Sequence, residues 1–222
     1  SLNTFVGSAA GGAKQSSSNN TAVGAFAFDA GTGADNVAIG SGALGGGSNS
    51  AADNVAIGLD AGNQISSGAS NVLIGSHAGD ALTEGGNNTA VGFQALTSDT
   101  LGSRSVAIGQ FALNNQNFTT ATDSINVAVG YNAGLSVTTA RGNTLVGSAA
   151  GDALTVGNAN VAMGYNSLGG DTKGDRNVAI GYEALLTQNF TTSTDSYNTA
   201  VGFHAGTAIT TGVENTLIGG LA

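Results

Sequence analysis

Side chains that could act as a nucleophile or a general base near neutral pH are scarce in this sequence. The 222 residues include two histidines, His77 and His204, and no cysteine. A nucleophile needs an adjacent base, and that base needs a partner that orients it. The two histidines stand at the same place in repeats that are seven repeats apart, where other repeats carry Asn, Gln or Glu. We therefore expect exposed polar positions there, and no enzymatic activity.

Metal-binding patterns are also missing from the sequence. The aspartates do not follow the spacing of an EF-hand loop, and the glycine-rich nonapeptide of calcium-binding β-rolls does not occur. Scattered aspartates at turns suit local hydrogen bonds from backbone N–H groups instead. We expect neither a metal site nor a cofactor.

Two insertions, residues 116–124 and 188–196, are the best candidates for ligand recognition. They read QNFTTATDS and QNFTTSTDS, so each places a phenylalanine among hydroxyl groups. Extra residues in a repeat array should bulge outward, where an aromatic ring can cover the apolar face of a sugar. In the alternative interpretation, each ring folds back over a coil edge or a neighbouring chain. The candidate residues are Phe118, Thr119, Thr120, Phe190, Thr191 and Thr192.

The acidic composition narrows the range of partners. Five Lys and Arg stand against 14 Asp and Glu, which gives a formal net charge of -9. Affinity for nucleic acid depends on basic side chains that neutralise phosphates, so nucleic acid is not expected as a partner. Acidic membrane surfaces are disfavoured for the same reason. Because no run of about 18 apolar residues occurs, no membrane insertion is predicted for this fragment.

A nine-residue repeat organises the whole chain. It reads Asn, Thr or Val, Ala, Val or Ile, Gly, any two residues, Ala, and Gly or Leu. The starts of successive repeats are nearly evenly spaced, and the two longest intervals hold the insertions. Residues 1–222 are therefore expected to form one repeat domain, a fragment of a longer fibre. The repeats begin at Asn3, Asn20, Asn36, Asn54, Asn71, Asn88, Ser105, Asn126, Asn143, Asn160, Asn177, Asn198 and Asn215.

Each repeat predicts one short β-strand of about five residues. Residues 36–40 (NVAIG) alternate between larger apolar and small side chains, and this period of two is typical of a strand. Glycine in the fifth place suits a sharp corner or a very close backbone approach. Asparagine in the first place predicts an amide ladder, in which each side chain bonds to its copy in the next coil. The glycine content disfavours a helix.

The regular spacing favours one repeat per coil of a solenoid. A coil built from four repeats would enclose a hole that alanine and valine cannot fill. We therefore predict an all-β parallel β-solenoid of about 13 coils, mostly of 17 residues, with a propeller as the alternative. A coil this short has little interior of its own, and the small third residue, as in Ala38 and Ala179, suggests a face against which another backbone packs. A homotrimer is expected on this ground, with a monomeric solenoid left open.

Two further regularities run along the repeats. Every fourth repeat, counted from the first, replaces the third-place alanine with a large side chain, which indicates duplication of a four-repeat block. Aromatic residues also recur directly after the fifth-place glycine, which predicts a stacked column. The large third-place residues are Phe5, Leu73, Leu145 and Leu217, and the aromatic column comprises Phe93, Tyr131, Tyr165, Tyr182 and Phe203.

The repeat resembles a known family over essentially the whole chain. Residues 36–40 (NVAIG), 105–109 (SVAIG) and 177–181 (NVAIG) resemble the head repeat of YadA-like trimeric autotransporter adhesins, and residues 88–96 and 198–206 also resemble repeat arrays of bacteriophage tail-fibre proteins. The resemblance implies a left-handed parallel β-roll of three chains side by side. The spacing between repeats is longer here than in the compact adhesin repeat.

This resemblance implies a structural or attachment module of an extracellular fibre. The location would be a virion tail fibre or a bacterial cell surface, and the rigid trimeric rod would bind host-surface glycans through many weak contacts at once. The alternative is a purely architectural spacer or self-assembling filament that recognises only its own copies. In both cases the main partner is the chain itself.

Overall fold

A computed structural model describes residues 2–12, 17–46 and 50–222 of the chain. The residues group into an N-terminal unit, residues 1–105 and 117–123, and a C-terminal unit, residues 106–116 and 124–222. Each unit is a parallel β-solenoid with one short strand per turn. The described ranges contain strands and turns but no helix, and hence no helix long and apolar enough to cross a membrane.

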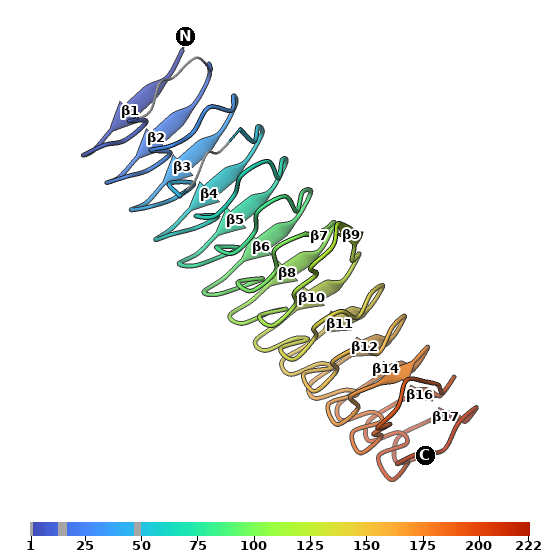
Figure 1. Cartoon of the computed structure of the whole chain (residues 1–222). Helices are drawn as coiled ribbons and strands as arrows, with labels where there is room; N and C mark the ends of the chain where they lie inside the picture. The colour runs from blue at the N-terminus through green and yellow to red at the C-terminus, as the bar shows by residue number, and fades with distance from the viewer. Residues whose placement is uncertain (1, 13–16, 47–49) are drawn as a thin grey trace. The chain divides into compact units, whose positions relative to one another are not determined.

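The N-terminal unit stacks its first six strands in parallel, and Figure 1 shows their arrows side by side. Each pairing joins equivalent places of successive repeats, as in Thr21↔Val37 and Val37↔Val55. A second, two-stranded sheet pairs β7 with β9, which belongs to the first insertion. The strands are β1 (Thr4–Val6), β2 (Thr21–Val23), β3 (Val37–Ile39), β4 (Val55–Ile57), β5 (Val72–Ile74), β6 (Thr89–Val91), β7 (Gly102–Ser103) and β9 (Thr122–Asp123).

The C-terminal unit repeats this arrangement with seven stacked strands. Its second insertion contributes β15, which pairs with β13. All thirteen repeats therefore form the strand that the sequence predicts, although each strand has three residues rather than five. The strands are β8 (Val106–Ile108), β10 (Val127–Val129), β11 (Thr144–Val146), β12 (Val161–Met163), β13 (Gly174–Asp175), β14 (Val178–Ile180), β15 (Thr194–Asp195), β16 (Thr199–Val201) and β17 (Thr216–Ile218).

The strand side chains point in directions that correct the sequence analysis. The small third residue lies inside the turn, since Ala128 and Ala179 are 0% exposed. The second and fourth residues, such as Val178 and Ile180, lie on the outside and are half-buried. The expectation that the alanines form a face against another chain is therefore wrong. Most repeats place alanine inside, and Leu73 and Leu145 are equally buried at this place, where they pack against Gly79 and Gly151.

The fifth-place glycine allows one turn to approach the next. Gly130 has a φ of 138°, and a Cβ placed on it would lie 2.4 Å from the carbonyl oxygen of Gly147. Gly147 has the same relation to Gly164, at 2.4 Å. Both the left-handed backbone and the lack of space exclude a side chain. This confirms the close backbone approach that the sequence predicts.

The first-place asparagines form the predicted ladder inside the solenoid. The Nδ2 group of Asn143 donates to Oδ1 of Asn126 at 3.3 Å and to the carbonyl of Gly157 at 2.9 Å. Its own Oδ1 accepts a hydrogen bond from the backbone N–H of Asn160 at 2.9 Å. Each amide thus links one turn to the next and also crosses the interior to the far wall. These bonds satisfy backbone groups that a loop-rich turn would otherwise leave unpaired in its interior.

The core is filled by pairs of residues whose sizes complement each other. In most turns that place glycine ninth in the repeat, a large apolar residue follows three positions later, as Leu154 follows Gly151, whereas Lys14 follows Gly11. A Cβ on Gly151 would lie 2.8 Å from Leu145 and 2.9 Å from Leu154. In most turns that place leucine ninth, as at Leu185, a buried polar residue such as Gln188 follows instead.

Candidate functional site

The outer sheet face is an exposed apolar feature of each unit. We define it as the second and fourth side chains of the repeat strands, none of which is charged. Ile39, Ile108 and Met163 remain 38%, 38% and 40% exposed on it. Monomeric soluble proteins rarely expose contiguous apolar surface of this kind, so such surfaces mark interaction sites. The face comprises Thr4, Val6, Thr21, Val23, Val37, Ile39, Val55, Ile57, Val72, Ile74, Thr89 and Val91 in the N-terminal unit, and Val106, Ile108, Val127, Val129, Thr144, Val146, Val161, Met163, Val178, Ile180, Thr199, Val201, Thr216 and Ile218 in the C-terminal unit.

Part of the predicted aromatic column is a stack of rings. The ring centroids of Tyr165 and Tyr182 lie 5.1 Å apart, and those of Tyr182 and Phe203 lie 5.4 Å apart, with nearly parallel planes. His204 packs against Phe203 at 4.1 Å and points Nε2 at Oε2 of Glu183, 3.3 Å away. The charge of Glu183 raises the pKa of Tyr182. Tyr165, Tyr182 and Phe203 remain 49%, 44% and 55% exposed in this stack.

The two insertions fold back onto the solenoid. Phe118 and Phe190 are only 5% and 6% exposed, so neither ring offers a platform on which a sugar could stack. The expectation of outward-facing rings is thereby corrected, and the alternative in which each ring covers a coil edge describes their placement. The neighbouring hydroxyl side chains do lie exposed: Thr119, Thr120, Thr191 and Thr192.

A buried aspartate fixes the path of each insertion. Oδ1 of Asp99 accepts hydrogen bonds from the backbone N–H of Phe118 at 3.1 Å and of Gly102 at 3.0 Å. Asp171 does the same for Phe190 at 3.2 Å and Gly174 at 3.0 Å. Both carboxylates are fully buried, and such charge-assisted bonds are among the stronger ones in proteins. Each insertion is therefore part of the folded unit.

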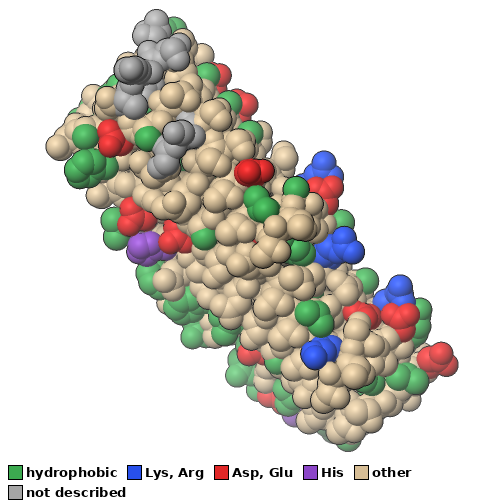
Figure 2. Space-filling model, viewed as in Figure 1, with side chains coloured by type: hydrophobic (Ala, Val, Ile, Leu, Met, Phe, Trp, Pro, Cys, Tyr) green, Lys and Arg blue, Asp and Glu red, His purple; other side chains and the backbone are tan. Residues whose placement is uncertain are grey.

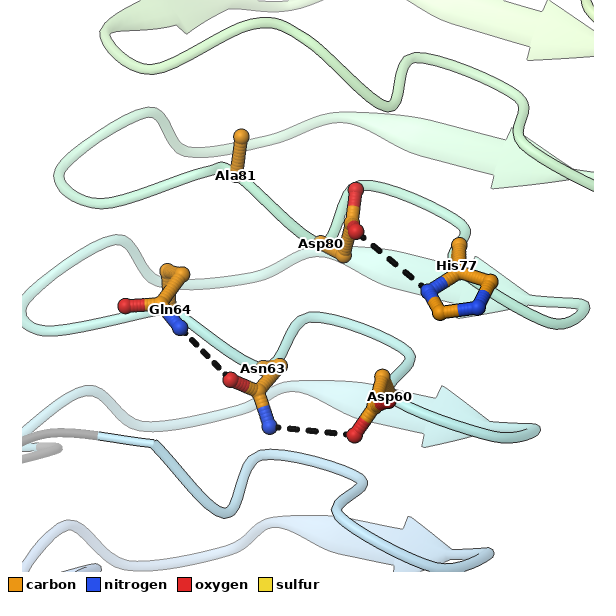
Figure 3. Close-up of a pocket in the computed structure, with 6 residues that line it drawn as sticks. All are labelled: Asp60, Asn63, Gln64, His77, Asp80 and Ala81. Carbon is orange, nitrogen blue, oxygen red and sulfur yellow. Dashed lines mark hydrogen bonds and ion pairs between the residues drawn. The ribbon is translucent and has the colours of Figure 1, made fainter.

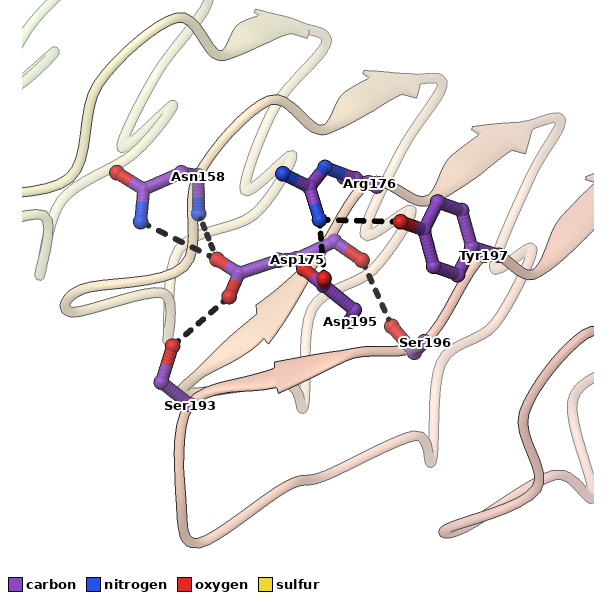
Figure 4. Close-up of polar contacts among 7 residues, drawn as sticks. All are labelled: Asn158, Asp175, Arg176, Ser193, Asp195, Ser196 and Tyr197. Atoms are coloured by element: carbon purple, nitrogen blue, oxygen red, sulfur yellow. Dashed lines mark hydrogen bonds and ion pairs between the residues drawn. The ribbon is translucent and has the colours of Figure 1, made fainter.

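Polar contacts also tie the second insertion to β13, as Figure 4 shows. Asp175 accepts hydrogen bonds from the hydroxyl of Ser193 at 2.8 Å and from Nδ2 of Asn158 at 3.2 Å. Arg176 forms an ion pair with Asp195 and donates to the hydroxyl of Tyr197 at 3.1 Å. The negative charge of Asp195 raises the pKa of Arg176. These groups bind one another, so few of their hydrogen-bond donors and acceptors are left for a ligand.

The first insertion carries a matching ion pair. Nη1 of Arg104 lies 2.6 Å from Oδ2 of Asp123, and both side chains are more than half exposed. Figure 2 shows blue Lys and Arg atoms next to red Asp and Glu atoms on the visible face. Neither insertion therefore presents an isolated basic patch for an anionic ligand.

Each histidine lies beside an acidic side chain within its own unit. His77 belongs to the N-terminal unit, where Nδ1 lies 3.4 Å from Oδ2 of Asp80, and His204 belongs to the C-terminal unit. Among the residues that the structure describes, no three His, Cys, Asp or Glu side chains are placed to hold a metal ion. His77 instead lines a polar pocket together with Asp60 and Asp80.

Comparison with known proteins identifies no relative. No family model matches the chain, and neither the curated proteins nor the solved structures contain a match.

Sequence reasoning missed the aspartates that hold the insertions, although the sequence carries a signal for them. One turn before each insertion stands a similar segment, residues 99–104 (DTLGSR) and residues 171–176 (DTKGDR). A segment that recurs only beside an insertion indicates residues that position it. Comparing these two segments also points to Arg104 and Arg176, which form the ion pairs with Asp123 and Asp195.

Proposed function

We propose that this chain is a structural module of an extracellular fibre, in which copies of the chain associate side by side through the outer sheet face. The observation that carries the proposal is the composition of that face, which presents Val, Ile, Thr and Met on turn after turn and no charge. The association would be a homotrimer, as the resemblance to adhesin heads and tail-fibre arrays implies, in a virion tail fibre or on a bacterial cell surface.

The energetics of burial support this association. About 25 cal/mol is gained for each Å² of apolar surface removed from water. Half-exposed β-branched side chains recur at regular spacing along each unit, so even a modest gain per turn adds up over several turns. Side chains such as Val178 are already restricted in rotamer by the strand, which keeps the entropy cost of packing them low.

A purely architectural spacer is the second candidate function, and one observation favours it. The rings of Phe118 and Phe190, which the sequence analysis selected for glycan contact, are buried in the fold. A chain whose apolar surface serves self-association would need no further ligand. The two candidates share the assembly and differ in attachment.

Sedimentation measurements over a wide concentration range test the assembly. We expect a mass three times that of the chain for the wild type, and a monomer for the double variant Val178→Glu with Ile180→Glu, because buried unpaired carboxylates oppose the contact. Thr191→Glu adds a charge at an exposed position of the second insertion and should leave the trimer intact. A monomeric wild type at every concentration would contradict the proposal.

A further inference from the structure

A polar cavity of about 260 Å³ lies between the turns that follow β4 and β5 in the N-terminal unit. Figure 3 shows its walls, with three lining side chains contributed by each of the two turns. The volume is slightly below that of pockets that hold drug-sized ligands, and it suits a single small ring. The lining residues are Asp60, Asn63, Gln64, His77, Asp80 and Ala81.

Hydrogen bonds fix the shape of this cavity. Nδ2 of Asn63 donates to the carbonyl of Gly42 at 2.9 Å and to Oδ1 of Asp60 at 3.3 Å. Nε2 of Gln64 donates to Oδ1 of Asn63 at 2.7 Å. Glycines of the preceding turn leave room for this wall, because a Cβ on Gly42 would collide with Asp60. The first wall is thus preorganised.

The second wall is held in the same way. Oδ1 of Asp80 accepts a hydrogen bond from the hydroxyl of Thr97 on the next turn, and Oδ2 lies 3.4 Å from Nδ1 of His77. The His77 and Asp80 side chains remain 32% and 30% exposed. The contact with Asp80 uses Nδ1 of the imidazole, so Nε2 is the atom that can face a ligand.

The second histidine gives an informative contrast. His204 stands at the same place in its repeat, but its ring packs on Phe203 at 4.1 Å and its Nε2 lies 3.3 Å from Glu183. The His204 imidazole is therefore engaged by two neighbouring side chains, whereas Asp80 contacts only Nδ1 of His77. The cavity does not follow from the repeat itself, and it depends on the residues that these two turns carry.

The chemistry of the lining selects the class of ligand. Two carboxylates supply strong acceptors for hydroxyl groups. Both N–H groups of Asn63 are engaged within the wall, so Gln64 is the carboxamide that supplies a donor as well as an acceptor. The six lining residues include neither Lys nor Arg, which disfavours anionic ligands such as phosphates and acidic sugars. Metal ions are disfavoured because no three ligating side chains converge among the described residues. A lone ammonium group would leave the remaining N–H donor of Gln64 without an acceptor.

We propose that this cavity binds one neutral monosaccharide unit of a glycan. The carboxylates of Asp60 and Asp80 accept hydrogen bonds from sugar hydroxyls, and the carboxamide of Gln64 both donates and accepts. This site would supply the attachment part of the proposed function and in that sense rests on it, although the cavity is complete within one chain. Several copies in one fibre would then bind with avidity.

Saturation-transfer NMR on the full chain tests the proposal. The probes are the methyl glycosides of mannose, galactose, glucose and N-acetylglucosamine, with Nα-acetyl-lysine methylamide as a cationic probe. We expect transfer to at least one glycoside, and about tenfold weaker binding after Asp60→Ala or Asn63→Ala. No transfer to any glycoside, or binding of the lysine probe alone, would overturn the proposal.

Two matched variants control for indirect effects. His204→Gln changes the equivalent histidine, and Asp152→Asn changes an aspartate at the same repeat position as Asp80, both in the C-terminal unit. Neither should alter sugar binding, and an equal loss in these variants would overturn the assignment of the site. Sedimentation of the same samples separates the two proposals: a trimer that binds no sugar contradicts this site alone, and a monomer that binds sugar contradicts the assembly alone.

Discussion

Replacing Asn143 by alanine tests the part played by the interior ladder. The substitution leaves two buried backbone groups without partners: the N–H of Asn160, which donates to Oδ1 of Asn143 at 2.9 Å, and the carbonyl of Gly157, which accepts from Nδ2 at 2.9 Å. Oδ1 of Asn126 keeps one partner, the backbone N–H of residue 143. Each orphaned group costs about 1–3 kcal/mol, so the free energy of unfolding should fall by about 2–6 kcal/mol.

Urea denaturation followed by circular dichroism measures this loss. Asn115→Ala is the matched control, because its exposed side chain should contribute no more than about 0.5 kcal/mol. A decrease of this small size for Asn143→Ala as well would refute the reasoning that the amide ladder satisfies the interior backbone. A loss of folding at room temperature would agree with the upper end of the expected range, since domains of this kind are stable by about 5–15 kcal/mol.

Three further predictions concern the backbone and the aromatic stack. Gly130→Ala should lower the melting temperature more than Gly142→Ala. Both residues have positive φ, but only a Cβ at residue 130 would meet a neighbouring turn, at 2.4 Å from the carbonyl oxygen of Gly147. Equal decreases in melting temperature would argue against the close approach. Ile125→Gly should raise the free energy of unfolding by about 1 kcal/mol, because the β-branched residue holds a strained φ of 47°. The residue is 57% exposed, so removing its side chain costs little packing. A lower free energy of unfolding in urea titrations would contradict this strain. Glu183→Gln should shift the ionisation of Tyr182 to lower pH in ultraviolet difference titrations, because the charge of Glu183 raises that pKa; an unchanged titration would show that the carboxylate does not act on the phenol.

The repeat made the fold predictable, because its spacing fixes the length of one turn. Glycine and asparagine at such regular positions indicate a close backbone approach and an amide ladder. The direction of the strand side chains was mispredicted. A period of two shows that residues such as Val178 and Ala179 face opposite ways, but it does not tell which side is the interior. A larger apolar residue usually marks the core, whereas here most repeats place alanine inside and the β-branched residues outside.

The candidate site was less predictable than the fold. Local sequence placed Phe118 and Phe190 in insertions but could not show that buried aspartates draw the insertions inward. The cavity beside His77 depends on side chains from two successive turns and on the space above Gly42, and a single repeat read alone reveals neither. The complementary pairs of the core, such as Gly151 with Leu154, were readable from sequence once the turn length was known.

Distances between chains test most directly whether the outer sheet face joins copies of the chain. The protein has no cysteine, so Val178→Cys or Thr191→Cys introduces a unique site for a spin label. Pulsed electron paramagnetic resonance on each labelled sample should give interchain distances that are shorter at residue 178 on the outer sheet face than at residue 191 on the insertion. Shorter distances at residue 191, or no interchain coupling at residue 178, would contradict assembly through this face.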